Sequence, residues 1–284
     1  MSDSQPLPVS LLLALNKCFK LPVHPFNTQA DGGMRYSEWQ FEKGAQTIAY
    51  FLTKFTADGM FNGKTVLDVG CGAAGKSLYY ITLGARRVVG LDTIESYRGE
   101  ASDLARRKGL ESRFEYVCAD AADTGFADAA FDTVIINDAM EHVAKPGAVL
   151  RECLRVLAPG GRIYLNFPPY YHPYGAHLSD VIAIPWVHAF FSEKTMIAAY
   201  KRLVSGLSDG DERLTFRMAQ DGQHIAYINH MTIRRFKQLL RELPANCIYY
   251  HEEPLRGFLR PLSRIPGFRE FFVKMVVSVI EPAT

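Results

Sequence analysis

A glycine-rich loop at residues 70–75 carries the clearest chemical signal in the sequence. The loop reads Gly70-Cys71-Gly72-Ala73-Ala74-Gly75, a G-x-G-x-x-G pattern, and it follows the apolar run Val66–Val69. Glycines let a backbone turn tightly and approach a ligand closely, and a helix expected to begin near Lys76 offers backbone N–H donors beside the loop. The pattern predicts a cofactor loop between a strand and a helix.

The same loop suits two kinds of cofactor. In a dinucleotide site it faces a pyrophosphate, and an acidic residue about 20 positions further on holds a ribose; Asp92 has that place in the sequence. Asp68 lies two residues before the first glycine. Its carboxylate would repel a pyrophosphate but would attract the ammonium and sulfonium groups of S-adenosylmethionine. We therefore favour S-adenosylmethionine, with a nicotinamide-dependent oxidoreductase as the alternative.

Two more polar positions follow later strand-like runs. Asp120 comes after residues 114–118, where a carboxylate can accept a hydrogen bond from an adenine amino group, although it also suits a turn. Asn137 ends the run at residues 131–137 and opens the stretch Asn137-Asp138-Ala139-Met140-Glu141-His142-Val143. This stretch falls beside the point of an open α/β sheet where ligands bind.

Taken together, these motifs resemble those of the class I S-adenosylmethionine-dependent methyltransferases, especially the branch of ubiquinone and menaquinone biosynthesis. The resemblance covers roughly residues 60–170, and it also rests on Leu154–Gly161. It implies a seven-stranded sheet whose last strand is antiparallel. It further implies that the methionine part, the ribose and the adenine are bound in turn after the first three strands. The cofactor residues so expected are Asp68, Gly70, Cys71, Gly72, Gly75, Asp92, Thr93, Asp120, Ala121 and Asn137.

Methyl transfer from a sulfonium is an in-line displacement, so alignment of the acceptor and exclusion of water are the main tasks. A general base is needed only where the acceptor loses a proton. Histidine titrates near neutral pH, and the candidate bases are His142, His172 and His177. Candidate residues for shaping the acceptor pocket are Tyr170, Tyr171 and Tyr174, which serve equally well as core residues.

Strand-like and helical stretches alternate from Lys64 onward, which predicts a doubly wound, Rossmann-like α/β sheet with right-handed crossovers. The strands are expected at Thr65–Val69, Arg87–Leu91, Phe114–Cys118, Phe131–Asn137 and Arg162–Phe167. A preceding helix is expected after Ser37 as N-cap, with Gln40 at the capping-box position and an apolar stripe of Ile48, Phe51, Leu52 and Phe55.

Four segments follow from these patterns. Residues 1–60 form an N-terminal helical extension, and residues 61–167 form the cofactor-binding core. Residues 168–230 form an aromatic-rich insertion, interpreted as a lid over the substrate, because a loop of that length is usually functional or has structure of its own. Residues 231–284 supply a helix and the closing strands of the core, near 247–251 and 271–280.

Composition narrows the classes of function. The chain has 284 residues, 48% of them hydrophobic and 22% charged, with a net charge of +2, so we expect a globular protein that binds no nucleic acid. Five scattered cysteines without a C-x-x-C pair favour reduced thiols, no metal site and a cytoplasmic location. We expect no membrane-spanning segment and no signal peptide. The basic, apolar stretch Leu255–Arg264 is interpreted as a loop, with contact to a membrane surface as the alternative.

The sequence thus predicts an enzyme that methylates the oxygen, nitrogen or carbon of a small aromatic or lipid-like molecule. The alternatives are the oxidoreductase and a non-catalytic binding module with the same fold. The acceptor and the oligomeric state are left open.

Overall fold

The computed structural model describes residues 7–23, 27, 33–259, 261–265 and 267–283. The chain forms two compact units. We call one the sheet unit; it comprises Met34–Phe167, Ile233–Glu253 and Met275–Thr284. We call the other the helical unit; it comprises Met1–Gly33, Pro168–Thr232 and Pro254–Lys274.

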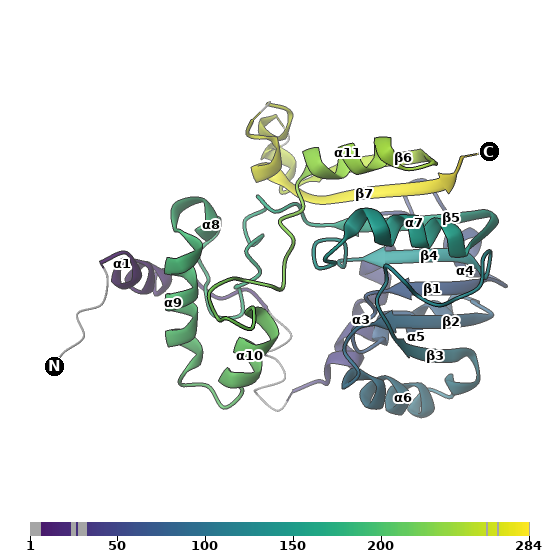
Figure 1. The fold of residues 1–284 in the computed structure, drawn as a ribbon, viewed down its shortest axis with the longest axis horizontal. Coiled ribbons are helices and arrows are strands. Elements are labelled where there is room, and N and C mark those ends of the chain that lie inside the picture. Colours follow the sequence, from purple (N-terminus) through teal and green to yellow (C-terminus); the bar gives the residue numbers. More distant parts are fainter. Residues whose placement is uncertain (1–6, 24–26, 28–32, 260, 266, 284) are drawn as a thin grey trace. The chain divides into compact units, whose positions relative to one another are not determined.

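The sheet unit is built on a seven-stranded sheet with strand order β3-β2-β1-β4-β5-β7-β6 (Figure 1). Strands β1 to β5 pair in parallel, whereas β7 pairs antiparallel to β5. This topology confirms the predicted doubly wound sheet with an antiparallel closing strand. The strands are β1 (Thr65–Val69), β2 (Arg87–Asp92), β3 (Phe114–Cys118), β4 (Phe131–Asn137), β5 (Leu157–Phe167), β6 (Ala245–Pro254) and β7 (Val273–Pro282).

The strand register brings the expected site residues to one edge of the sheet. Val69 at the end of β1 pairs with Leu91 in β2, and Asn137 at the end of β4 pairs with Asn166 in β5. Because parallel strands all end at the same edge, the loops that follow β1, β2 and β4 leave the sheet together.

Helices cover both faces of this sheet. Figure 1 shows α7 and α11 on the near face and α3 and α5 behind it. Behind the sheet, Phe51, Phe61 and Leu78 pack with Val66 and Ile135 in a buried apolar cluster. The helices of this unit are α3 (Tyr36–Ile48), α4 (Ala57–Phe61), α5 (Gly75–Thr82), α6 (Tyr97–Arg107), α7 (Pro146–Val156) and α11 (Ile233–Glu242), with the short η1 (Glu111–Arg113).

The start of α3 differs from the prediction. Its N-cap is Arg35, and the Glu38 side chain accepts a hydrogen bond from the Arg35 backbone N–H at 3.3 Å. Ser37, expected as the cap, lies inside the helix and is fully buried. The predicted helical stripe was also wrong, because α3 ends at Ile48 and the other three members, Phe51, Leu52 and Phe55, lie beyond it; of these, Leu52 is 43% exposed. A serine is a common cap, but tertiary contacts of α3 decide where this helix begins.

The helical unit is assembled from segments far apart in sequence. It contains α1 (Leu7–Asn16), α8 (Val187–Phe190), α9 (Glu193–Val204), α10 (Gly210–Arg217) and the short η2 (Gly257–Leu259), η3 (Leu262–Arg264) and η4 (Arg269–Phe272). Leu12 of α1 packs in one apolar cluster with Tyr200 of α9 and Ile182. Beside this core, buried Asp180 forms ion pairs with Arg213 at 3.2 Å and Arg217 at 3.3 Å.

The unit boundaries fall inside two of the predicted segments. Residues 1–33 belong to the helical unit, whereas 34–60 belong to the sheet unit. Residues 254–274 interrupt the C-terminal segment and also belong to the helical unit. Those parts of the predicted N-terminal extension at 1–6, 24–26 and 28–32 lie outside the described residues. No helix in the described ranges has both the length and the apolar character needed to cross a bilayer.

Candidate cofactor site

The glycine loop joins β1 to α5 with a backbone that requires glycine at two positions. Gly70 has φ +72° and Gly72 has φ +56°, a left-handed region that disfavours other residues. A Cβ on Gly70 would lie 2.4 Å from Ala139 Cβ, in the turn after β4. The loop is also fixed to β2, since the backbone N–H groups of Gly70 and Cys71 donate to Leu91 O at 2.8 and 3.1 Å.

The third glycine, Gly75, is required because helix α3 packs directly against it. A Cβ on Gly75 would lie 1.9 Å from Ser37 O in α3. At the same place Gln40 of α3 spans the loop: its Nε2 donates to Cys71 O at 3.2 Å, and its Oε1 accepts from Gly75 N–H at 3.1 Å. Helix α3 therefore holds both ends of the loop through one buried amide, which sequence reasoning missed.

Asp68, the acidic residue before the loop, is buried beneath it. Its Oδ2 accepts a hydrogen bond from the Ser77 hydroxyl of α5 at 2.5 Å. Burial raises the pKa of Asp68 to about 6, against the lowering effect of this hydrogen bond and of Lys76. Charge on this carboxylate is thus costly by itself, and a nearby cationic group would favour it.

Asp92 ends β2 and contacts the glycine loop directly. Its Oδ2 accepts a hydrogen bond from Gly72 N–H at 2.8 Å, and its Oδ1 accepts one from Ile94 N–H at 3.1 Å. Burial raises the pKa of this carboxyl, while the backbone donors, Gly72 first, lower it. Thr93 beside it is exposed. Asp92 therefore joins the ends of β1 and β2, where a ribose is expected.

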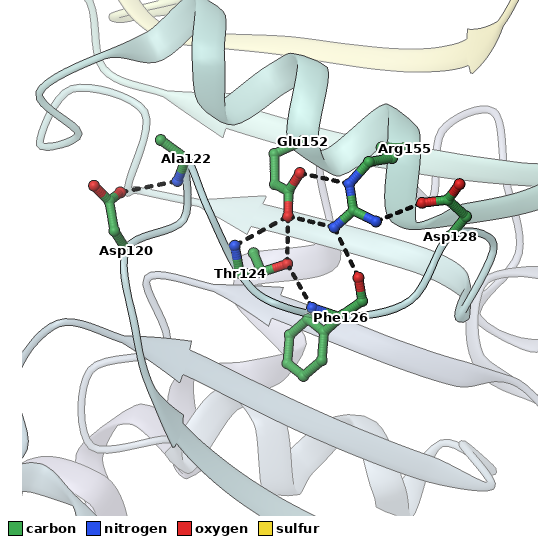
Figure 2. Close-up of polar contacts among 7 residues, drawn as sticks. All are labelled: Asp120, Ala122, Thr124, Phe126, Asp128, Glu152 and Arg155. Atoms are coloured by element: carbon green, nitrogen blue, oxygen red, sulfur yellow. Dashed lines mark hydrogen bonds and ion pairs between the residues drawn. The ribbon is translucent and has the colours of Figure 1, made fainter.

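Asp120 lies in the loop after β3. Its Oδ1 accepts from Ala122 N–H at 2.8 Å, which is the turn geometry weighed for it above (Figure 2). Ala121 between them is 9% exposed. The turn contact engages one carboxylate oxygen, and the adenine contact predicted for Asp120 stays a prediction.

The rest of that loop is tied to α7. Thr124 donates to Glu152 Oε1 through both its backbone N–H, at 3.0 Å, and its hydroxyl, at 2.5 Å (Figure 2). Arg155 donates to Glu152, to Phe126 O at 2.8 Å and to Asp128 at 2.5 Å. The Arg155 guanidinium lowers the pKa of Glu152 to about 2, so this anchor keeps its charge at physiological pH.

Buried polar atoms without partners gather where β4 and β5 end. Asn137 is 4% exposed, and Glu141 lies in the following turn and is 3% exposed. Neither side chain has a hydrogen-bond partner among the described residues, and Asn166 Nδ2 has none either. Asn166 Oδ1 accepts from Asp138 N–H at 3.1 Å. Buried polar groups are almost always paired, so these atoms indicate a place that a bound polar group completes.

His142 is the candidate base that lies in this turn. Its Nε2 is 3.7 Å from Glu141 Oε1 and its side chain is 21% exposed. Burial, followed by the nearby Asp138 carboxylate, raises the pKa of Glu141 well above its usual range. The charged form of this buried carboxyl is therefore disfavoured.

The other two histidines and the three tyrosines belong to the helical unit. His172 Nδ1 accepts from Tyr174 N–H at 3.3 Å, and burial lowers the pKa of His172 to about 4. The His177 ring lies 6.2 Å from Tyr227. Tyr170 packs against Tyr171, with ring centroids 5.2 Å apart. The roles predicted for these residues remain predictions, because these residues belong to the helical unit and the glycine loop belongs to the sheet unit.

Sequence reasoning missed four buried residues of the sheet unit: Gln40, Ser77, Glu141 and Asn166. The sequence does give one indication of Ser77: it lies nine positions after Asp68, in the first turn of the helix that follows the glycine loop and covers Asp68. Cys71, expected among the cofactor contacts, packs its side chain with Ala74, Ala101 and Tyr116. A contact from Cys71 to the cofactor would therefore come from its backbone.

Residues 67–165 match the family profile described as a methyltransferase domain. The chain is 35% identical over 102 residues to tocopherol O-methyltransferase of Arabidopsis thaliana, a match that covers 36% of this chain and 29% of that protein. It is 40% identical over 114 residues to ubiquinone biosynthesis O-methyltransferase of Idiomarina loihiensis, covering 38% and 44%. The matches thus span less than half of these relatives.

Solved structures share the fold over most of the chain. The [4+2]-cyclase SpnF aligns with TM-score 0.56 and 17% identity, covering 92% of each chain. The PH0226 protein of Pyrococcus horikoshii aligns with TM-score 0.51 and 18% identity, covering 85% of this chain and 91% of that one. The matched methyltransferase domain agrees with the predicted resemblance, and the strand order and these two structures confirm the predicted fold.

The residues present fit S-adenosylmethionine. Asp92 ends β2 at the sheet edge from which the glycine loop leaves, where the sequence predicts the ribose, and the unpartnered Asn137 amide lies at the same edge. Asp68 supplies a buried carboxyl whose ionised form a cation would stabilise.

Proposed function

We propose that this protein transfers a methyl group from S-adenosylmethionine to a small, largely apolar acceptor. The observation that carries the proposal is the set of polar groups at one sheet edge: Asp92 bound to the glycine loop, Asp68 beneath it, and the unpartnered side chain of Asn137. Two carboxyl groups at this edge suit a cofactor with cationic groups and ribose hydroxyls better than they suit a pyrophosphate.

The bound cofactor would supply an activated methyl group. In this proposal Asp92 and Thr93 bind the ribose, Asp120 and Ala121 contact the adenine, and the ionised Asp68 faces the cationic methionine part. Asn137 holds the remaining polar atoms of the ligand and regains the hydrogen bonds that its buried amide lacks. The protein's work is then to align the acceptor and keep water out.

Where the acceptor loses a proton, we propose His142 as the base. It lies in the turn after β4, and its Nε2 is 3.7 Å from Oε1 of its buried neighbour Glu141. His172 and His177 stay alternatives from the helical unit. The pKa of His172, lowered to about 4 by burial, makes this histidine a weak base.

The acceptor class is supported by two independent features. The named relatives act, by their names, on tocopherol and in ubiquinone biosynthesis, and a further relative is a sterol 24-C-methyltransferase of Aspergillus fumigatus, 35% identical over 103 residues. The insertion at 168–230 presents clustered aromatic side chains, among them Tyr170, which contacts the rings of Tyr171 and His188. We propose that this insertion covers an aromatic or lipid-like acceptor.

A second candidate function is favoured by one observation. SpnF is a [4+2]-cyclase and shares this fold over 92% of its length. Since one fold hosts different reactions, the chain is alternatively a binding module or catalyses a reaction without methyl transfer.

Calorimetric titration with S-adenosylmethionine, S-adenosylhomocysteine and NADH tests the cofactor, and transfer of labelled methyl groups to a panel of phenols, quinols and sterols tests the reaction. We expect the adenosyl ligands to bind and NADH not to bind. Asp92→Asn should weaken adenosyl binding about 10-fold or more, because a carboxylate forms stronger hydrogen bonds to hydroxyls than an amide.

Asp123→Asn is the matched control, since Asp123 is exposed in the loop after β3. It should leave the affinity unchanged. Adenosyl binding without transfer to any acceptor class would favour the second candidate, and NADH binding alone would overturn the proposal.

A further inference from the structure

The connection between β6 and β7, taken with the first two residues of β7, concentrates positive charge. The sequence from Leu255 to Lys274 carries the basic residues Arg256, Arg260, Arg264, Arg269 and Lys274 and one acidic residue, Glu270, a net charge of +4. The whole chain carries only +2, so the remaining residues are net negative by 2. We call Leu255–Lys274 the basic connection.

The basic connection also exposes large apolar side chains. Phe258 is 74% exposed and Phe268 is 60% exposed, and both lie within a few residues of an arginine. Ile265 and Leu262 are exposed to 44% and 37%. Large apolar side chains exposed together with several arginines in one short segment are a feature of interaction surfaces.

The connection is held in place at its base. Leu255 N–H donates to Phe272 O at 2.8 Å, which closes the segment into a loop. Trp186 Nε1–H donates to Phe271 O at 3.2 Å, and the Tyr171 ring lies 5.2 Å from that of Phe271. Phe271 and Phe272 are thus used to anchor the loop, whereas Phe258 and Phe268 lie between the anchored ends and face solvent.

Exposed apolar side chains are unevenly divided between the units. Among the described residues, every exposed large apolar side chain lies in the helical unit except Leu52 and Ile248. Within the helical unit only the basic connection joins such side chains to a net charge of +4. The positive charge of the basic connection favours a partner with an anionic surface. The exposed Phe258 and Phe268 suit a partner that accepts apolar side chains without a defined pocket.

We propose that the basic connection docks the protein on a bilayer surface that contains anionic phospholipid. Arginines near such a surface gain from its negative potential, while aromatic side chains enter the boundary between headgroups and acyl chains. The proposal goes beyond methyl transfer and does not depend on it. If the acceptor is apolar, docking would bring the protein to the phase in which the acceptor dissolves.

Co-sedimentation of the full chain with vesicles of phosphatidylcholine, with and without phosphatidylglycerol, tests the proposal without an acceptor. We expect binding only to the anionic vesicles, weakened by raising the salt concentration. The double variant Arg256→Gln/Arg264→Gln should bind about 30-fold more weakly, since each arginine near an anionic membrane contributes about a factor of five. The double variant Phe258→Ser/Phe268→Ser should lose at least about 10-fold.

Phe190→Ser is the matched control, because Phe190 in α8 is 76% exposed but lies outside the basic connection. Its vesicle binding should equal that of the unmodified protein. Equal binding to neutral vesicles, an equal loss in the Phe190 variant, or no binding at all would overturn the proposal. A dimer by analytical ultracentrifugation that only the Phe258/Phe268 variant dissociates would assign the surface to a second copy instead. Adenosyl binding, measured on the same variants, should be unchanged.

Discussion

The two units bury charge in different ways. In the sheet unit, Asp68 has one hydroxyl partner, Ser77, and its pKa is raised to about 6. In the helical unit, Asp180 is fully buried but forms ion pairs with Arg213 and Arg217, and it accepts a hydrogen bond from the Tyr200 hydroxyl at 2.8 Å. Among the described residues the first carboxyl forms no ion pair, whereas the second is neutralised by two arginines. The difference suits the role predicted for Asp68, facing a cationic ligand, and a structural role for Asp180.

The largest expected effect tests the architectural role of Asp180. Asp180→Ala leaves Arg213 and Arg217 buried without their shared carboxylate, and breaking such a buried pair costs about 3–5 kcal/mol. We expect the free energy of unfolding, from denaturant titration, to fall by this amount. Binding of S-adenosylhomocysteine to the folded variant should stay within about twofold, because the glycine loop belongs to the other unit.

Asp211→Ala is the control for this variant, since Asp211 is an exposed residue of the same unit, in the first turn of α10. It should cost less than about 1 kcal/mol. A loss of ligand affinity in the Asp180 variant equal to its loss of stability would contradict the division of roles between the units.

Sequence patterns predicted the sheet unit better than the helical unit, for a physical reason. The strands, the glycine loop and Asp92 are linked by spacing along the chain, because a strand, a tight turn and a helix follow one another directly. The network of Asp180, Arg213 and Arg217 joins residues more than 30 positions apart across irregular backbone, which no periodicity indicates.

Within the site, prediction failed where a contact came from another element. Gln40 was assigned to a capping box, yet it bridges Cys71 and Gly75 across the glycine loop. The position of Gln40 depends on how α3 packs against the glycine loop, and no pattern within the sequence of α3 indicates that packing. Asn137 was predicted from its place at the end of a strand, but Asn166 on the paired strand became visible only through the register.

A smaller effect is expected from the contact between α3 and the glycine loop. In Gly75→Ala the new methyl group would lie 1.9 Å from the Ser37 carbonyl oxygen, a backbone atom that cannot move without shifting α3. We expect a loss of about 3 kcal/mol in the free energy of unfolding. Calorimetry should also show weaker adenosyl binding, since Gln40 then no longer spans the loop.

Gly99→Ala is the matched control, because Gly99 lies inside α6 and a Cβ there meets nothing within 4 Å. This variant should be as stable as the unmodified protein or more stable by up to about 1 kcal/mol. If Gly75→Ala behaved like Gly99→Ala, α3 would not be the reason for the third glycine.

The smallest of these effects concerns the charge on Asp68. Since its pKa rises from 3.8 to about 6 on folding, the folded state holds a proton that the unfolded state has lost between these values. Its contribution to stability is therefore present below pH 4 and is lost as the pH rises through 6. We expect Asp68→Asn to remove this dependence and to be about 2 kcal/mol more stable than the unmodified protein at pH 8, measured by denaturant titration at several pH values.

Ligand binding should show the opposite preference. If the ionised Asp68 faces a cationic methionine part, affinity for S-adenosylmethionine rises as the pH passes from 5 to 7, and Asp68→Asn abolishes the rise. S-adenosylhomocysteine lacks the sulfonium charge, so its affinity should change less over the same range. Parallel pH profiles for the two ligands would place Asp68 away from the sulfonium. If Asp68→Asn were more stable and also bound S-adenosylmethionine more tightly, the ionised carboxylate would not serve the binding of the cofactor.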